Sequence, residues 1–232
     1  MPSDQGHEAT VGARSPRWSE GGGRPCLVRC RAAAVGLLRR RLSPALSRIA
    51  RLAGALATRV PTAVEDPSRK LAAVAVILVR DPDAVLLIRR ADREGDRWSG
   101  QMAFPGGRWS SEDPDLLATA QRETQEEVGV DLSEARLLGR FDDSAPRTQL
   151  LPPVIVRPFV FVLESRQLLV PNHEVAAAVW TPFDALLEPG VYRPFEFAAR
   201  GTRMLLPGYH LEQGVVWGMT ERILTPLLSL GS

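Results

Sequence analysis

The chain has 232 residues, of which 44% are hydrophobic and 24% are charged, and its net charge is +2. These are the values of a globular protein, and they exclude a disordered chain. Apolar residues form no uninterrupted run of about 18, so we expect no transmembrane helix. The small net charge gives no reason to expect a nucleic-acid partner. The two cysteines, Cys26 and Cys30, lack a matching pair or a histidine cluster, which favours free thiols in a reducing compartment over a zinc site.

Charge is distributed unevenly along the chain. Residues 1–64 sum to +8, whereas the remaining residues sum to −6. Residues 1–25 are rich in Gly, Ser, Pro and Arg without apolar periodicity, which predicts disorder. Residues 26–65 form an arginine-rich extension that is partly helical, because apolar residues recur at helical spacing between 46 and 56.

Three interpretations of this extension stay open. The plainest is a helix packed on the following domain, entered where Ser43 and Pro44 fit an N-cap and a first helical position. An organellar, for example mitochondrial, targeting segment fits the arginine-rich and acid-poor composition. An amphipathic anchor on an anionic membrane is the third. RNA binding is disfavoured because Trp18 is nearly the only aromatic residue there. We expect a cytoplasmic protein unless the segment directs it to an organelle.

A compact domain is expected over residues 70–230, after a linker at 61–70. "LAAVAVILV" and "DAVLLIRR" are short β-branched and apolar runs joined by "RDPD", which predicts a hairpin. Farther on, "VIVRPFVFVLE" predicts a central strand, and "VAAAVWTPFDALL" a strand followed by a short helix. "GVVWGMTERILTPLLSL" predicts a final helix entered near Thr220. Strands and helices alternate without a strict βαβ rhythm, which favours an α/β (α+β) domain with a mixed sheet flanked by helices.

The stretch "FPGGRWSSEDPDLLATAQRETQEEVGV" predicts a helix after a paired-glycine turn. We expect Asp113 to cap this helix, with Pro114 and Asp115 in its first turn and Gly129 at its end. At 100° per residue, three glutamates fall within an arc of about 100°. Those residues are Glu123, Glu126 and Glu127. On a neighbouring arc, Leu117, Thr124 and Val128 can bury against the sheet.

Three carboxylates on one side of a helix repel one another, and this predicts a bound cation. Arg122 and Arg108 offset only part of their charge. Hard oxygen ligands favour Mg²⁺ or Mn²⁺ over zinc, and magnesium also binds phosphate oxygens of substrates. Glycines such as Gly106 and Gly107 let the backbone approach closely, so their carbonyls can face a metal and their amides a phosphate. Together these features predict phosphorus chemistry on a diphosphate.

The segment resembles the signature of the Nudix hydrolases, whose box ends R-E-U-x-E-E-x-G-U, where U is apolar. Arg122, Glu123, Glu126, Glu127 and Gly129 match, while Thr124 replaces the usual aliphatic residue. The resemblance implies an α/β/α sandwich with a mixed sheet. It also implies metal-dependent hydrolysis of a nucleoside diphosphate linked to another moiety. Glu123, Glu126 and Glu127 would then be the metal ligands, with Glu126 alternatively a base, and Arg122 would orient them by ion pairing.

The spacing departs from the family pattern at one point. Gly106-x5-Glu112 fits, but nine residues rather than seven separate Glu112 from Arg122, so the role of Glu112 is open. This longer loop is similar to the coenzyme A pyrophosphatase branch of the family, as are "LLIRRA", "NHEVAAAVW" and "VVWGMTERIL". The resemblance implies coenzyme A or its thioesters as substrate, cleaved to 4′-phosphopantetheine and 3′,5′-ADP.

Several alternatives stay open beside that substrate. ADP-ribose or a nucleotide sugar is the nearest rival, and a ligand-sensing module without turnover is another. Glu174, in "NHEV", is a candidate base or additional ligand. His173 and His210 are better explained as structural than as catalytic. Trp98, Trp109 and Trp217 could each stack on an adenine base, but core packing is the better interpretation of Trp217, whereas Trp98 and Trp109 flank the glycine turn and stay open. Oligomeric state does not follow from the sequence, and a homodimer is compatible with it.

Overall fold

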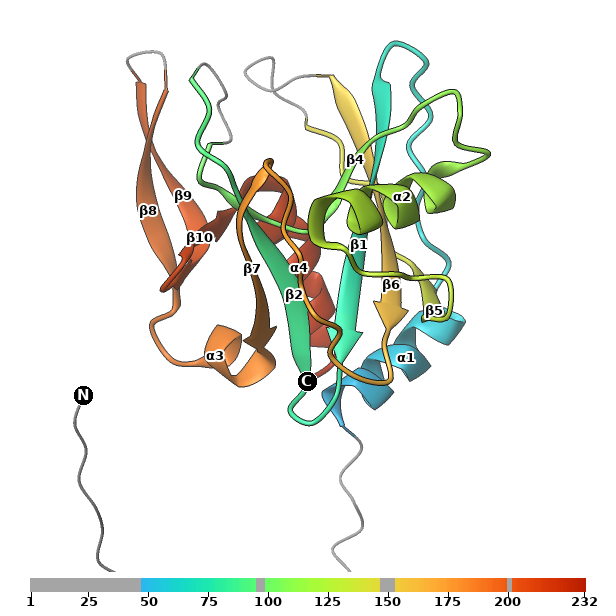
Figure 1. The fold of residues 1–232 in the computed structure, drawn as a ribbon. Coiled ribbons are helices and arrows are strands. Elements are labelled where there is room, and N and C mark those ends of the chain that lie inside the picture. The colour runs from blue at the N-terminus through green and yellow to red at the C-terminus, as the bar shows by residue number, and fades with distance from the viewer. Residues whose placement is uncertain (1–46, 95–98, 147–152, 200–201) are drawn as a thin grey trace, which may run out of the picture. The chain divides into compact units, whose positions relative to one another are not determined.

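The computed structural model describes residues 47–94, 99–146, 153–199 and 202–232. Figure 1 shows the arrangement of the elements. The helices are α1 (Arg48–Thr58), α2 (Leu116–Val128), α3 (Phe183–Leu187) and α4 (Gly218–Leu230). The strands are β1 (Lys70–Val79), β2 (Ala84–Arg90), β3 (Met102–Ala103), β4 (Gly106–Arg108), β5 (Arg136–Arg140), β6 (Val154–Val162), β7 (Val175–Pro182), β8 (Tyr192–Ala199), β9 (Thr202–Leu211) and β10 (Gly214–Trp217).

The strands form one mixed sheet. Its order is β5-β6-β1-β2-β3-β10-β9-β8, with β4 paired to β1 and β7 paired to β2. β1 runs parallel to β6 and β10 parallel to β3, whereas the other pairs are antiparallel. The mixed sheet predicted from the sequence is therefore confirmed.

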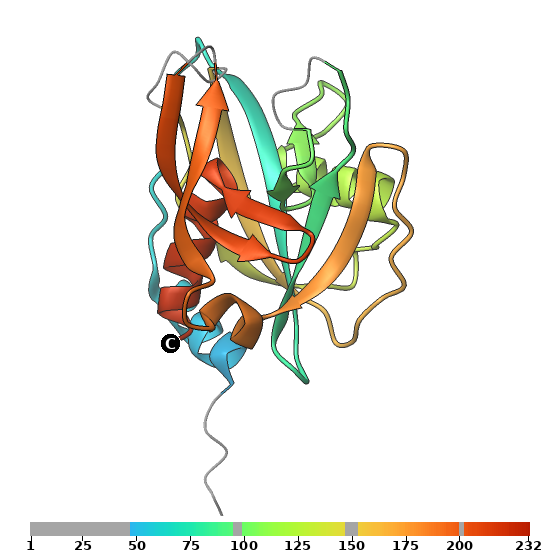
Figure 2. The same ribbon diagram turned by 90° about the vertical axis from the view of Figure 1, so that its left-hand side faces the viewer.

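Helices cover both faces of this sheet. Side chains alternate along β1, so that Ala73, Ala75 and Ile77 pack toward α2. Val76 and Leu78 point to the other face and join a cluster with residues of α1 and α4. Figure 2 shows α2 and α4 on opposite sides of the sheet. This is the predicted α/β/α arrangement.

The helix expected in the arginine-rich extension is present and packed. Ser47 caps α1, and its hydroxyl accepts a hydrogen bond from Ala50 N–H. Ile49, Leu52 and Leu56 recur at helical spacing and are buried in the cluster with α4. For residues 48–58 the structure thus agrees with the packed-helix interpretation. The predicted disorder of residues 1–25, the expected cap at Ser43 and both cysteines lie outside the described residues.

The predicted hairpin is confirmed, because β1 and β2 pair antiparallel around the turn at residues 80–83. The C-terminal region differs from the prediction. α4 begins at Gly218 rather than near Thr220, and the preceding residues form β10. Gly218 adopts φ +68°, a conformation that suits glycine and turns the chain from strand to helix. β8 and β9 were not predicted, because prolines and charged residues interrupt their apolar alternation.

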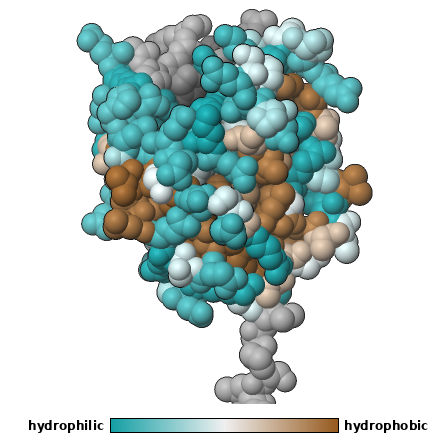
Figure 3. Space-filling view, turned by 45° about the vertical axis from the view of Figure 1, so that its right-hand side comes forward, coloured by the Kyte–Doolittle hydropathy of each residue, from teal (hydrophilic) through white to brown (hydrophobic). Residues whose placement is uncertain are grey.

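The surface shows no broad apolar belt in the view of Figure 3. There, hydrophilic residues dominate the upper part of the visible face and hydrophobic residues form separate patches lower down. Within the described ranges, no helix has the length and apolar character needed to cross a membrane.

Candidate active site

The predicted helix start is wrong by two residues. Asp115, not Asp113, is the N-cap of α2, and its carboxylate accepts a hydrogen bond from Ala118 N–H at 2.8 Å. Gly129 ends the helix in the left-handed conformation, as predicted. Thr124 and Val128 are fully buried on the sheet side of the helix.

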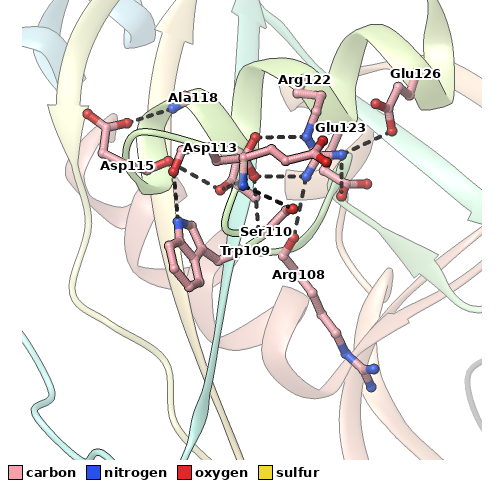
Figure 4. Close-up of polar contacts among 11 residues, drawn as sticks. Arg108, Trp109, Ser110, Asp113, Asp115, Ala118, Arg122, Glu123 and Glu126 are labelled. Atoms are coloured by element: carbon pink, nitrogen blue, oxygen red, sulfur yellow. Dashed lines mark hydrogen bonds and ion pairs between the residues drawn. The ribbon is translucent and has the colours of Figure 1, made fainter.

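Asp113 is instead the partner of Arg122 (Figure 4). The guanidinium donates Nε–H to Oδ1 at 2.9 Å and Nη2–H to Oδ2 at 3.0 Å, a bidentate pair. Thr119 donates its hydroxyl to the same carboxylate at 2.9 Å. The bond from Arg122 is the main reason that the pKa of Asp113 is lowered, and Asp113 in turn raises the pKa of Arg122. Asp113 therefore carries a fixed, fully compensated negative charge.

Arg122 also reaches the glutamates of the helix. Its Nη1 lies 2.9 Å from Glu123 Oε1 and 3.1 Å from Glu126 Oε2. The ion pairing expected of Arg122 is thus present in the structure. Figure 4 shows the Arg108 side chain pointing away from these carboxylates, while its backbone carbonyl accepts a bond from Arg122. Arg108 therefore does not offset their charge as the sequence suggested.

Glu127 is the most enclosed of the three glutamates. Only 3% of its surface is exposed, and its carboxylate accepts the Gly106 N–H at 2.9 Å. The pKa of Glu127 is raised to about 7, mainly by burial; the Gly106 N–H bond and the charge of Arg90 oppose this rise, whereas the charges of Glu123 and Glu174 add to it. Burial also raises the pKa of Glu123 despite its contact with Arg122. A cation bound nearby would therefore stabilise the ionised form of both carboxylates.

The paired glycines allow β4 to lie tightly between β1 and α2. Gly106 has φ +149°, and a methyl group there would overlap the Ala73 carbonyl. At Gly107 a methyl group would overlap the Glu123 carboxylate. The Gly106 amide faces Glu127, whereas the sequence analysis expected the amides to face a phosphate. The glycine turn therefore positions Glu127 through a hydrogen bond and leaves space for the carboxylate of Glu123.

A loop before β7 brings Glu174 to the same place. Asn172 N–H bonds to the Glu127 carbonyl at 2.9 Å, so the loop is fixed on the C-terminal end of α2. Glu174 Oε1 forms an ion pair with Arg93 Nη2 at 3.1 Å, and its negative charge raises the pKa of both Glu123 and Glu127. His173, with an 82% exposed side chain, lies on the surface.

Sequence reasoning missed three residues of this region. Asp113, which the sequence suggested as a helix cap, is the carboxylate that holds Arg122, whereas Glu112 is exposed. The altered spacing of the loop left the role of Glu112 open but did not identify Asp113. Arg90 is the last residue of β2 and Arg93 follows this strand, and nothing in their spacing pointed to Glu127 or Glu174.

The donor set fits a divalent cation, although the side chains are not preassembled around one. Within the part of the chain that the structure describes, no three His, Cys, Asp or Glu side chains form a closed metal cage. Glu126, with a 54% exposed side chain, points toward solvent from the edge of the group. The buried carboxylate of Glu127 and the partly buried one of Glu123 repel each other and nevertheless supply hard oxygen ligands whose charge is only partly compensated, which suits Mg²⁺ or Mn²⁺.

A cavity of about 800 Å³ beside Trp109 is a separate feature. Part of its charged lining is paired already, since Arg69 contacts Asp66 and Arg157 contacts Asp143. Trp109 donates its indole N–H to the Asp113 carbonyl at 3.2 Å. None of the three glutamates lines this cavity, so it is not the candidate site.

A model of the NUDIX domain matches residues 69–201. The chain belongs to the Nudix family. The Nudix hydrolase NudL of Pectobacterium atrosepticum, itself uncharacterized, is 30% identical over 166 residues, covering 68% of this chain and 81% of that protein. An uncharacterized protein of Schizosaccharomyces pombe is 42% identical over 103 residues, which cover 42% of this chain and only 31% of that protein. The chain spans less than half the length of the Schizosaccharomyces pombe protein and of the Yersinia NudL proteins that it also matches.

The overall structural similarity between this protein and solved structures of the family is low. A MutT/nudix family protein from Enterococcus faecalis has a TM-score of 0.48 and 19% identity over 75% of this chain and 64% of its own. The NUDIX domain of Shewanella oneidensis NrtR, solved with ADP ribose, has a TM-score of 0.42 and 20% identity over 53% of this chain and 82% of its own. The family assignment rests on the sequence comparisons and not on these values.

Proposed function

We propose that the protein is a Mg²⁺- or Mn²⁺-dependent pyrophosphohydrolase of nucleoside diphosphate derivatives, with coenzyme A or its thioesters as the leading substrate. The observation that carries the proposal is the placement of Glu127. It is buried against Gly106, its pKa is raised to about 7, and Glu123 and Glu174 add negative charge to its surroundings. A divalent cation bound next to Glu127 would stabilise its buried negative charge, which the protein itself compensates only in part.

Glu123, Glu126 and Glu127 would hold this cation, with Glu174 as a further ligand or as the base. When bound, the metal would neutralise the charge of the diphosphate and lower the pKa of an attacking water. Arg122 would keep Glu123 and Glu126 on the site side of α2, and Asp113 would fix Arg122. Gly106, Gly107 and Arg108 would form the strand that the diphosphate approaches.

The choice of coenzyme A rests on the motif "FPGGR…TAQRETQEEVG" and on the longer loop before α2. ADP-ribose and nucleotide sugars contain the same diphosphate linkage and are the nearest rivals. The residues around Glu127 act on the linkage itself, so they do not discriminate between these substrates.

A substrate panel tests the proposal. Purified full-length protein with Mg²⁺ or Mn²⁺ is given coenzyme A, acetyl-coenzyme A, ADP-ribose and a nucleotide sugar, and phosphomonoester products are measured. We expect turnover that EDTA abolishes, fastest with coenzyme A or its thioester. Turnover in EDTA would refute the metal dependence, and faster ADP-ribose hydrolysis would refute the leading substrate.

A further inference from the structure

One face of the β8–β9–β10 strands carries aromatic side chains. Tyr209 marks the face toward α4, because it is buried and its hydroxyl bonds to Thr225 of that helix. Tyr209 is in register with Val216, so the next residue, Trp217, lies on the opposite face. Phe195 and Phe197 also lie there, since Tyr192 of the same strand pairs with Tyr209. Figure 2 shows α4 behind these strands and no described helix in front of them.

The Trp217 ring contacts both phenylalanine rings, and all three rings stay partly exposed. Trp217 lies 4.5 Å from Phe197 and 5.7 Å from Phe195, measured between ring centroids. None of the three belongs to the buried core, so the sequence-based interpretation of Trp217 as a core residue is wrong. The cross-strand neighbour of Trp217 on β9 is Gly208, where any side chain would meet Val215 at 2.8 Å. The absence of a side chain at Gly208 lets Val215 and Phe195 pack closely over this position.

This aromatic face continues into the candidate active site. Arg90 N–H bonds to the Gln101 carbonyl at 3.0 Å, and Gln101 Nε2–H bonds to the Trp217 carbonyl at 3.1 Å. Gln101, the residue before β3, therefore links the end of β2 to the end of β10. Arg90 and Trp217 are two strand spacings apart, about 10 Å. Ile88 packs on the α2 side of β2, so Arg90 shares that side, where its charge acts on Glu127.

We propose that Trp217, with Phe195 and Phe197, forms the surface on which the nucleobase of the substrate stacks. The proposal rests on the proposed function, because it assigns the part of the substrate attached to the diphosphate held near Glu127. The three side chains are uncharged, so they favour a planar base over another phosphate. Stacking of a base on an aromatic side chain contributes substantially to binding and tolerates different bases.

The test compares substrates with and without a base. Coenzyme A or ADP-ribose, whichever the wild type hydrolyses faster, is paired with its analogue carrying hydrogen in place of adenine. Both are assayed with wild type, Trp217→Leu, Trp217→Phe and Leu205→Ala. Leu205 lies on the same hairpin, 71% exposed, on the face opposite the aromatic rings. Thermal unfolding of each variant verifies its fold.

We expect Trp217→Leu to raise KM for the adenine substrate about 10-fold, with a much smaller change in kcat. KM for the analogue without a base should stay nearly constant, Trp217→Phe should restore most of the affinity, and Leu205→Ala should resemble wild type. Equal changes for both substrates, or no change, would overturn the inference while leaving the proposed function intact. An effect that depends only on the acyl chain of coenzyme A thioesters would overturn it as well. Absence of wild-type turnover on every substrate would refute the proposed function itself.

Discussion

Asp113 and Glu127 are both buried carboxylates beside α2, but their surroundings differ. Asp113 receives two bonds from Arg122 and one from Thr119, and its pKa is lowered. Glu127 receives one backbone amide, faces other acids, and its pKa is raised to about 7. The first carboxylate is compensated within the protein and therefore serves the architecture. The second lacks such compensation, which is typical of a site that awaits a positively charged ligand.

The largest expected effect separates these two roles directly. Glu127→Gln keeps an acceptor for the Gly106 amide but removes the charge that would hold the metal. We expect kcat to fall on the order of 1000-fold, several kcal/mol in the barrier, with the fold retained. Turnover with Mg²⁺ is measured beside Glu112→Gln, an exposed acid that should behave as wild type. Near-normal turnover of Glu127→Gln would remove the basis of the metal assignment.

The pH dependence of stability sharpens the same contrast. Because the pKa of Glu127 is raised from 4.5 to about 7, the folded state binds more protons than the unfolded state between these values. Metal-free wild type should therefore lose about 3 kcal/mol of unfolding free energy as pH rises from 4.5 through 7, relative to Glu127→Gln. Urea unfolding at several pH values in EDTA measures this difference. Glu126→Gln, at an exposed position, should follow wild type, and parallel curves for all three proteins would contradict the expectation.

Asp113→Asn tests the compensated partner. The change removes the negative charge from a bidentate pair and leaves Arg122 without its main acceptor. We expect a loss of about 2–3 kcal/mol in unfolding free energy, measured by urea denaturation with metal absent. Glu112→Gln is the matched control, because the neighbouring acid makes no ion pair with Arg122 among the described contacts. If Glu112→Gln proved the more destabilising change, the reassignment of this role to Asp113 would be wrong.

The smallest effect is expected at the rim of the site. Arg93 and Glu174 form an ion pair with side chains 44% and 39% exposed. Arg93→Ala should therefore change the unfolding free energy by less than about 1 kcal/mol. A much larger loss in thermal or urea unfolding would show that the pair is part of the structural framework, like Asp113 and Arg122.

The sequence predicted the central features of the fold and left gaps that have physical causes. The hairpin of β1 and β2, the strand β6 and the helix α2 follow clear apolar patterns and were predicted. β8 and β9 were missed because Pro194, Pro207 and Gly208 interrupt the alternation of apolar and polar residues. The two strands are held by pairing with each other, and neither is buried on both faces, so the apolar pattern of a strand is weak.

The candidate site was predicted in its chemistry more than in its contacts. The spacing of Glu123 and Glu127 placed them on one side of a helix, and the structure confirms that both lie against the glycine strand. Spacing could not show that Asp113 would hold Arg122, because this contact depends on the conformation of the loop before α2. Nor could spacing show that Trp217 lies on the face of the sheet opposite α4, since that depends on the register of β10 with β9.

The most direct test of the account is the binding of Mn²⁺ to the metal-free protein, followed by electron paramagnetic resonance. We predict saturable binding to wild type and to Glu112→Gln, and binding weakened at least about 10-fold in Glu127→Gln. Equal Mn²⁺ affinity in wild type and Glu127→Gln would contradict the claim that the carboxylates of α2 bind the cation.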